Sequence, residues 1–133
     1  MEMDWKKTAL VVIDMENAFI DERSPLCIKQ AAATVPACGR VIRKARERKI
    51  PVFFVNRVYR KNGSDVEFTR YESWAKGGRY LAPGSTGPLS IEVPEEFLPT
   101  PEDYTIIKPR FSAFFQTELD LVLRRLGVKT VFL

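Results

Sequence analysis

The sequence predicts an α/β domain with a mainly parallel sheet, and three observations favour this fold class. Two short stretches, residues 9–13 and 52–55, are wholly apolar, which is typical of parallel strands that are covered on both faces. Between them, residues 34–48 carry apolar side chains at spacings of three and four, as in a helix that packs on a sheet by one face. Together the three segments predict a right-handed β-α-β unit with parallel strands.

The rest of the chain adds two strands and two helices to this prediction. Residues 65–74 have apolar side chains at helical spacing, and residues 103–108 (DYTIIK) are typical of a third strand. Residues 114–126 predict a helix that Gly127 closes, and residues 128–133 (VKTVFL) predict a fourth strand. A long excursion rich in Gly and Pro precedes the third strand, and such loops are usually functional or contain small local elements.

The length of the chain allows one domain, and its last residues favour an incomplete one. A chain of 133 residues with 45% hydrophobic content is enough for one core and short for two. It finishes on the fourth predicted strand, with no further helix to cover that strand, and one edge of the predicted sheet is left open. We therefore expect residues 1–133 to be the N-terminal portion of a single domain whose C-terminal part is missing.

Composition excludes several functional classes. Lys and Arg number 21 against 17 Asp and Glu, a surplus that favours an anionic ligand but is too small for a nucleic-acid surface. The sequence has no apolar stretch of transmembrane length, no signal-peptide core and no disulfide framework. We therefore expect a cytoplasmic protein without a nucleic-acid or membrane partner. The lack of histidine excludes Ser-His-Asp and Cys-His catalysis and removes the commonest zinc ligand.

Polar side chains mark the ends of three predicted strands. Asp14 follows the first strand, Asn56 follows the second, and Lys108 ends the third. Ligands of open α/β sheets bind beyond the carboxyl ends of the strands, so parallel strands would bring Asp14 and Lys108 to the same rim. There an ammonium beside a carboxylate would keep the acid ionised as a base and favour a nearby anion. A helix cap at Asp14 or a rim salt bridge explains the same residues equally well.

Three segments of the sequence carry a resemblance to a known family. They are VVIDMENAF at residues 11–19, IIKPRFSAFFQTELDLVLRRLGV at residues 106–128, and the VKTVFL that follows. In this order they resemble the isochorismatase-like cysteine hydrolases, which include nicotinamidases, carbamoylsarcosine and ureidoacrylate amidohydrolases, and isochorismatase. The resemblance implies a three-layer α/β/α sandwich around a mainly parallel, Rossmann-like sheet. It also implies a homo-oligomer that acts on a small-molecule substrate.

The same resemblance assigns catalytic roles to residues of this chain. It implies that Asp14 is the general base, Lys108 its electrostatic partner, and a cysteine the nucleophile. In the family this cysteine opens the helix after the fourth strand, beyond the end of this chain, and neither Cys27 nor Cys38 matches its position. We therefore expect a hydrolase of small amide, carbamoyl or ureido C–N bonds, of which residues 1–133 alone are inactive.

Two departures from the family pattern concern the metal and the pocket. Nicotinamidases of the family hold zinc through an Asp and histidines placed after the second strand, whereas this chain has NRVYR at residues 56–60. We therefore expect no metal and no cofactor, which argues against a nicotinamidase. Glu16 and Ala18 stand where the family signature commonly has Gln and Asp. These differences would change the pocket and leave the reacting groups as they are.

Phe19, Trp74 and Arg110 are the candidate substrate contacts. Phe19 matches an aromatic residue that lines the pocket in relatives, whereas Trp74 and Arg110 are an aromatic and a cationic group near the expected mouth. Packing in the core or solvation at the surface explains Trp74 and Arg110 equally well. Arg57 and Arg60 offer guanidinium groups that suit a substrate carboxylate, and a solvated loop explains them equally well.

Two other functions remain open from the sequence. One is a non-catalytic isochorismatase-like domain that uses the pocket for binding or assembly. The other is a Mg-dependent phosphoryl-transfer domain in which Asp14, with Glu16 two residues away, would serve as phosphoacceptor or metal ligand. Neither a phosphate-binding loop nor a dinucleotide fingerprint supports the second alternative.

Overall fold

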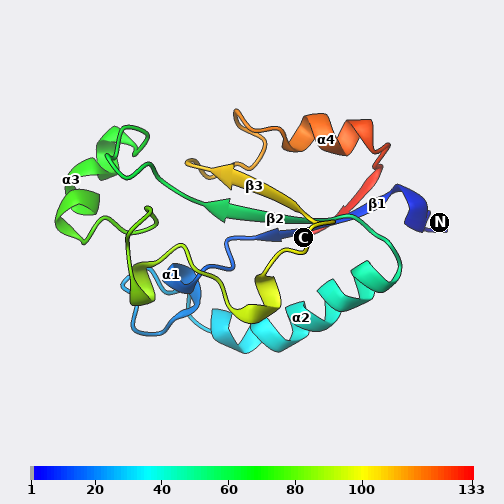
Figure 1. The fold of residues 1–133 in the computed structure, drawn as a ribbon, viewed down its shortest axis with the longest axis horizontal. Coiled ribbons are helices and arrows are strands. Elements are labelled where there is room, and N and C mark those ends of the chain that lie inside the picture. Colours follow the sequence, from blue (N-terminus) through cyan, green and yellow to red (C-terminus); the bar gives the residue numbers. More distant parts are fainter. Residues whose placement is uncertain (1) are drawn as a thin grey trace.

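The computed structural model describes residues 2–133 and has the predicted α/β fold, with a four-stranded parallel sheet. The strand order is β3-β2-β1-β4, and the helices α2 and α4 lie on opposite sides of the sheet (Figure 1). The sheet is therefore the middle of three layers. The bounds of these elements are β1 (Thr8–Ile13), β2 (Val52–Arg57), β3 (Tyr104–Lys108), β4 (Thr130–Phe132), α2 (Ala31–Glu47) and α4 (Leu119–Arg125).

The two central strands are buried because both of their faces are apolar. β1 and β2 run parallel with Leu10 paired to Val52 and Ile13 paired to Val55. The helix α2 connects them, and its buried Ile42 packs in one core cluster with Leu10 and Val52. The predicted β-α-β unit with parallel strands is confirmed. The helix begins three residues earlier than residue 34, where the sequence pattern placed its start.

The opposite face of the sheet is covered by α4, which is shorter than the sequence predicts. Its buried Leu119 and Leu123 pack on side chains of the three longer strands, among them Phe53 and Ile106. The prediction that this helix starts at residue 114 is wrong. Gln116 has a φ of 53°, in the left-handed region, and an α-helix cannot continue through that backbone conformation. The segment before Leu119 therefore forms turns.

The long excursion between β2 and β3 folds into small local elements beyond the carboxyl ends of the strands. Its longest helix is α3 (Phe68–Lys76), and Figure 1 shows α3 and the short α1 (Asn17–Ile20) on the side toward which the strand arrows point. A third core cluster forms there, around Tyr59, Trp74 and Leu81. The excursion also contains the 3₁₀ helices η2 (Gly87–Leu89) and η3 (Glu95–Phe97), of which η3 contacts α2, whereas the 3₁₀ helix η1 (Trp5–Lys7) precedes β1.

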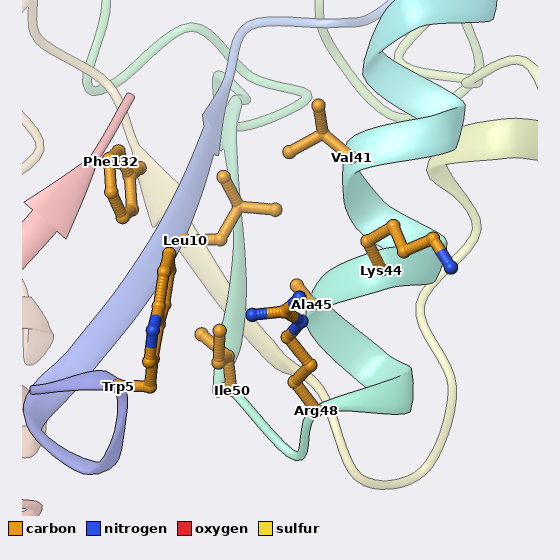
Figure 2. A pocket seen from close by; sticks show the side chains of 8 residues that line it. All are labelled: Trp5, Leu10, Val41, Lys44, Ala45, Arg48, Ile50 and Phe132. Carbon is orange, nitrogen blue, oxygen red and sulfur yellow. The ribbon is translucent and has the colours of Figure 1, made fainter. Parts of the chain in front are cut away.

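An apolar groove runs between α2 and the β1–β4 side of the sheet. It has a volume of about 350 Å³, and Trp5, Val41 and Phe132 line it (Figure 2). The rings of Trp5 and Phe132 stack with centroids 6.2 Å apart, and the Arg48 guanidinium lies 5.2 Å from the Trp5 ring. Figure 2 shows the Lys44 amino group directed away from the groove. This groove offers hydrophobic contact and no acid–base pair.

No helix within residues 2–133 combines the length and the apolar character that crossing a bilayer requires.

Candidate active site

The structure brings Asp14 and Lys108 together at the carboxyl end of the sheet. Lys108 Nζ donates a hydrogen bond to Asp14 Oδ2 over 3.0 Å. The two residues belong to the ends of β1 and β3, which are separated by β2. Lys108 pairs with Arg57, the last residue of β2, so the long lysine side chain crosses the end of that strand to reach the aspartate. This is the rim where ligands of open α/β sheets bind.

The ammonium of Lys108 is buried and has three acceptors. The residue is 1% exposed, and Nζ also donates to the carbonyl oxygens of Phe111, at 3.1 Å, and Arg110, at 3.4 Å. An ammonium has three N–H donors, so these contacts use all of them. Burial of a charge costs free energy unless it is paired and hydrogen-bonded, and here both conditions hold. The positive charge is thereby fixed in position.

The backbone of Asp14 is held in an uncommon conformation. Its φ is 56°, and such a conformation costs a non-glycine residue about 1–3 kcal/mol. The Asp14 N–H donates to the Val55 carbonyl over 2.9 Å, which ties the turn to β2. Asp14 Oδ1 is buried and makes no hydrogen bond within residues 2–133. One carboxylate oxygen thus holds Lys108, and the other is free to accept a proton.

Glu16 lies next to this pair and is buried completely, at 0% exposure. Its Oε1 accepts a hydrogen bond of 2.7 Å from the Arg57 backbone N–H, while Oε2 has no partner within the described residues. Burial raises the pKa of Glu16 to about 8, and the Arg57 N–H and the charges of Lys108 and Arg57 offset that rise only in part. This rise favours the neutral acid at neutral pH. In the sequence, this position stood out because Glu16 replaces the Gln that is common in the family signature.

Arg57 belongs to β2 and is committed to contacts within the protein. It is 4% exposed, and its Nη2 contacts both Glu67 and the Tyr59 hydroxyl. The Tyr59 hydroxyl also donates to Glu67 Oε2 over 2.7 Å, and the guanidinium lies 4.8 Å from the Phe111 ring centroid. The alternative of a solvated loop therefore does not apply to Arg57, which is a buried strand residue. Its guanidinium is not free to receive a substrate carboxylate while Glu67 holds it.

The pKa values of this second cluster follow from its contacts. Burial raises the pKa of Glu67, but the Tyr59 hydroxyl and the Arg57 charge outweigh burial and hold that pKa below its usual value. Burial, together with the Glu67 carboxylate, raises the pKa of Tyr59 to about 12. The stable state of the cluster is thus an ionised Glu67, a charged Arg57 and a neutral Tyr59.

The three candidate substrate contacts occupy different environments. Phe19 is half-buried and packs against the third core cluster. Arg110 is half-buried, and its Nη1 donates to the carbonyl of Asp65 over 2.5 Å, so it ties the segment after β3 to the loop before α3. Trp74 is 0% exposed, and its Nε1 donates to the Tyr80 carbonyl over 2.8 Å. Trp74 is thus a core residue in this structure, and we do not retain it as a substrate contact.

Neither cysteine makes a hydrogen bond with Asp14 or Lys108 in the part of the chain that the structure describes. Cys27 Sγ is 3.8 Å from the Ile20 carbonyl oxygen and 3.6 Å from that of Ile28. Cys38 belongs to α2 and packs against the core cluster on that side of the sheet. Within residues 2–133, no three His, Cys, Asp or Glu side chains gather as metal ligands would.

Comparisons with a family model and with curated proteins agree on one family. The Isochorismatase domain matches residues 8–133. The chain is 38% identical over 125 residues to a "probable inactive nicotinamidase" of Arabidopsis thaliana, a match that covers 93% of this chain and 63% of that protein. It is 29% identical over 149 residues to the ureidoacrylate amidohydrolase RutB of Pantoea ananatis, with coverages of 92% and 55%.

Solved structures agree with these matches. An isochorismatase family protein from Desulfovibrio vulgaris has a TM-score of 0.84 and 37% identity, over 94% of this chain and 64% of that one. The N-carbamoylsarcosine amidase from Thermoplasma acidophilum has a TM-score of 0.71 and 34% identity, over 94% of this chain and 65% of that one. The chain thus spans 55% to 65% of the length of these four proteins.

Proposed function

This chain belongs to the isochorismatase family, and from that premise we propose that it supplies the general base and its cationic partner to a hydrolase of small amide, carbamoyl or ureido C–N bonds. The observation that carries the proposal is the 3.0 Å hydrogen bond between Lys108 Nζ and Asp14 Oδ2, with Asp14 Oδ1 left without a partner. The base is Asp14. Lys108 is the fixed positive charge beside it.

The proposed reaction proceeds through a covalent intermediate. Asp14 takes the proton of a cysteine thiol, which we place outside residues 1–133, and the thiolate attacks the carbonyl carbon of the substrate. The C–N bond breaks, and the nitrogen leaves with the proton that Asp14 held. Water then attacks the thioester, Asp14 accepts its proton, and the thiol is restored when the acid product leaves. Lys108 stabilises the negative charge on Asp14 whenever the base is ionised.

Names of two relatives support the carbamoyl or ureido substrate class. One is the ureidoacrylate amidohydrolase, and the other is the N-carbamoylsarcosine amidase, at 29% and 34% identity. Both names describe compounds in which a carbonyl carbon is bonded to nitrogen in a ureido or carbamoyl group. We extend this group to the substrate of the present chain. Phe19 and Arg110 are the side chains we propose at the mouth of its pocket.

A second candidate is a non-catalytic domain that binds a small molecule or takes part in assembly. The observation that favours it is the 38% identity to a protein named a probable inactive nicotinamidase.

We also propose that the protein is a homo-oligomer. Light scattering of the purified protein tests the assembly, and a monomer mass would contradict it.

Ammonia release from a panel of substrates tests the proposed function. The panel contains an N-carbamoyl amino acid, a ureido acid and a simple primary amide. The natural protein that carries this chain is compared with residues 1–133 alone. We expect ammonia from a carbamoyl or ureido compound with the natural protein, and none with residues 1–133. Turnover by residues 1–133 would refute an external nucleophile, whereas binding without ammonia release by the natural protein would favour the non-catalytic domain.

A phosphoryl-transfer role is tested with an aryl phosphate and Mg²⁺. We expect no hydrolysis of the phosphate by the natural protein. If hydrolysis occurs, the Asp14→Ala variant decides its origin. Phosphatase activity that persists in this variant excludes Asp14 as phosphoacceptor, and activity that disappears would overturn the amidase proposal.

A further inference from the structure

We propose that Glu16 is a positioning residue: its buried carboxyl group joins the end of β2 to the turn after β1 and so keeps Asp14 beside Lys108. The part that concerns Asp14 as a base rests on the proposed function. The part that concerns the proton of Glu16 stands on the contacts of the buried carboxyl group.

The first step is the role of Glu16 in extending the sheet. The last paired residues of β1 and β2 are Ile13 and Val55, yet β2 continues to Arg57. Beyond Ile13 the chain turns away at Asp14, so the Arg57 N–H loses a strand partner on that side. Glu16 Oε1 accepts this N–H over 2.7 Å. A side chain thus replaces a missing strand carbonyl, which satisfies a buried backbone donor.

The second step is the anchoring of Glu16 itself. Its backbone carbonyl accepts the N–H groups of Phe19, at 2.9 Å, and Ile20, at 3.1 Å, so Glu16 is the N-cap residue of α1. Both ends of the residue are therefore fixed, the backbone by α1 and the carboxyl group by β2. Asp14 lies two residues earlier in a strained backbone conformation with a φ of 56°. Such a conformation persists only where the surroundings over-determine it, and the Glu16 clamp is one of these constraints.

The third step is the charge state of the clamp. Glu16 Oε2 is buried without a partner within residues 2–133, and an ionised oxygen in that place would lose its hydration without compensation. Burial is the main reason that the pKa of Glu16 rises to about 8, and the negative charge of Asp14 raises it further. The charged groups that act against the rise are Lys108 on β3 and Arg57 on β2. The neutral acid leaves Asp14 and Lys108 as a balanced pair, and ionised Glu16 adds a second negative charge.

A carboxyl-carbon NMR titration tests the inference on the whole protein, labelled with ¹³C in the Asp and Glu carboxyl groups. Assignment of Glu16 uses the Glu16→Gln variant, which keeps an oxygen acceptor for the Arg57 N–H but cannot ionise. We expect the Glu16 signal to titrate with a midpoint near pH 8. The Asp14 signal should shift with the same midpoint in the parent protein and stay constant over that range in Glu16→Gln.

Two results would overturn the inference. Titration of Glu16 near its ordinary value of 4.5 would show that the clamp is ionised at neutral pH. Titration near 8 without a matching shift of the Asp14 signal would show that Glu16 does not position Asp14. If Glu16→Gln fails to fold, titration of the parent still shows whether Glu16 ionises near pH 4.5 or near pH 8. The Asp14→Asn variant then identifies the Asp14 signal.

The pH dependence of unfolding gives an independent readout. Because the pKa of Glu16 is raised on folding, its contribution to stability is complete below about pH 4.5 and is lost as the pH rises through about 8. The urea midpoint of the parent should fall between about pH 6 and about pH 9 by more than that of Glu16→Gln. The exposed Glu22→Gln variant is the matched control and should follow the parent. Equal pH dependence in the parent and Glu16→Gln would contradict a proton held by Glu16.

These measurements involve no substrate, so the two proposals fail separately. A Glu16 that titrates near 8 in a protein without ammonia release would overturn the proposed function alone. A Glu16 that titrates near 4.5 in a protein that hydrolyses a carbamoyl compound would overturn the positioning role alone.

Discussion

Two buried ion pairs lie at the carboxyl ends of the strands, and they differ in what each leaves unpaired. In the first, the side chains of Lys108 and Asp14 are 2% and 32% exposed, and in the second those of Arg57 and Glu67 are 5% and 18% exposed. Both oxygens of Glu67 have partners, Arg57 and the Tyr59 hydroxyl. Asp14 uses only one oxygen, and its backbone is in the left-handed region.

The difference separates a structural pair from a chemical one. The Arg57–Glu67 pair fastens the end of β2 to the residue before α3, and every contact of its carboxylate is made within the protein. The Lys108–Asp14 pair holds a carboxylate in place while one acceptor stays unused. The Arg57–Glu67 pair is thus a closed network, whereas the Lys108–Asp14 pair leaves one carboxylate oxygen without a partner, as the proposed general base requires.

The largest effect on stability should come from Arg57→Met. Removal of the guanidinium leaves the buried side of Glu67 without its cation, and it also removes the contacts with the Tyr59 and Phe111 rings. Loss of one partner of a buried pair costs about 3–5 kcal/mol. Urea unfolding measures the change. A cost below about 1 kcal/mol, the range of surface pairs, would show that this network is not structural.

A smaller loss, about 2 kcal/mol, should follow from Lys108→Met. The carboxylate left behind is that of Asp14, which is 32% exposed and is hydrated in part, so it tolerates the loss better than Glu67 does. The matched control is Lys76→Met, which removes an exposed pair with Glu72 and should change the free energy of unfolding by less than about 0.5 kcal/mol. Equal costs for Lys108→Met and Arg57→Met would erase the proposed difference between the pairs.

Acid should weaken the closed network, whereas alkali should weaken the clamp at Glu16. The pKa of Glu67 is held below its usual value, so its contribution to stability is present at neutral pH and is lost as the pH falls through the folded-state pKa. Glu67→Gln should cost about 1 kcal/mol at neutral pH. The difference in unfolding free energy between parent and variant should shrink on acidification. A difference that grows would reverse the sign we assign.

The smallest effect should come from Arg70→Gln. The Arg70 guanidinium lies 5.1 Å from the Phe111 ring on a partly exposed surface, where a cation–π contact contributes about 0.5 kcal/mol. Because Arg70 makes none of the contacts of Glu67, the variant separates ring stacking from the buried pair. A cost near that of Arg57→Met would mean that the ring contacts dominate the network.

The parallel sheet and the meeting of Asp14 with Lys108 were predictable from the sequence. Wholly apolar segments mark buried parallel strands, and parallel strands end at one rim. The position of Arg57 was not predictable. An arginine after an apolar run is typical of an exposed strand end, and its burial depends on Glu67, ten residues later, and on Phe111 from the segment after β3. Such pairing over long sequence separation leaves no local pattern.

Two other outcomes show the same limit. An aromatic residue such as Trp74 follows the same pattern whether it lines a pocket or packs in the core, and only the fold shows it buried. Glu16 differs from the family signature, and this was visible in the sequence. Its proton was not, because the charge state follows from complete burial and an oxygen without a partner. In both cases chemistry depends on burial, which a single sequence does not report.

A comparison of turnover between two carboxylate variants tests whether Asp14 is the general base. Ammonia release from a carbamoyl or ureido compound is measured with the natural protein and with its Asp14→Asn and Glu67→Gln variants, each checked for native secondary structure by circular dichroism. We predict that Asp14→Asn lowers the rate by about 100-fold or more, the loss expected for a general base. Glu67→Gln should retain most of the parental rate. An Asp14→Asn variant that turns over at the parental rate would show that Asp14 is not the general base.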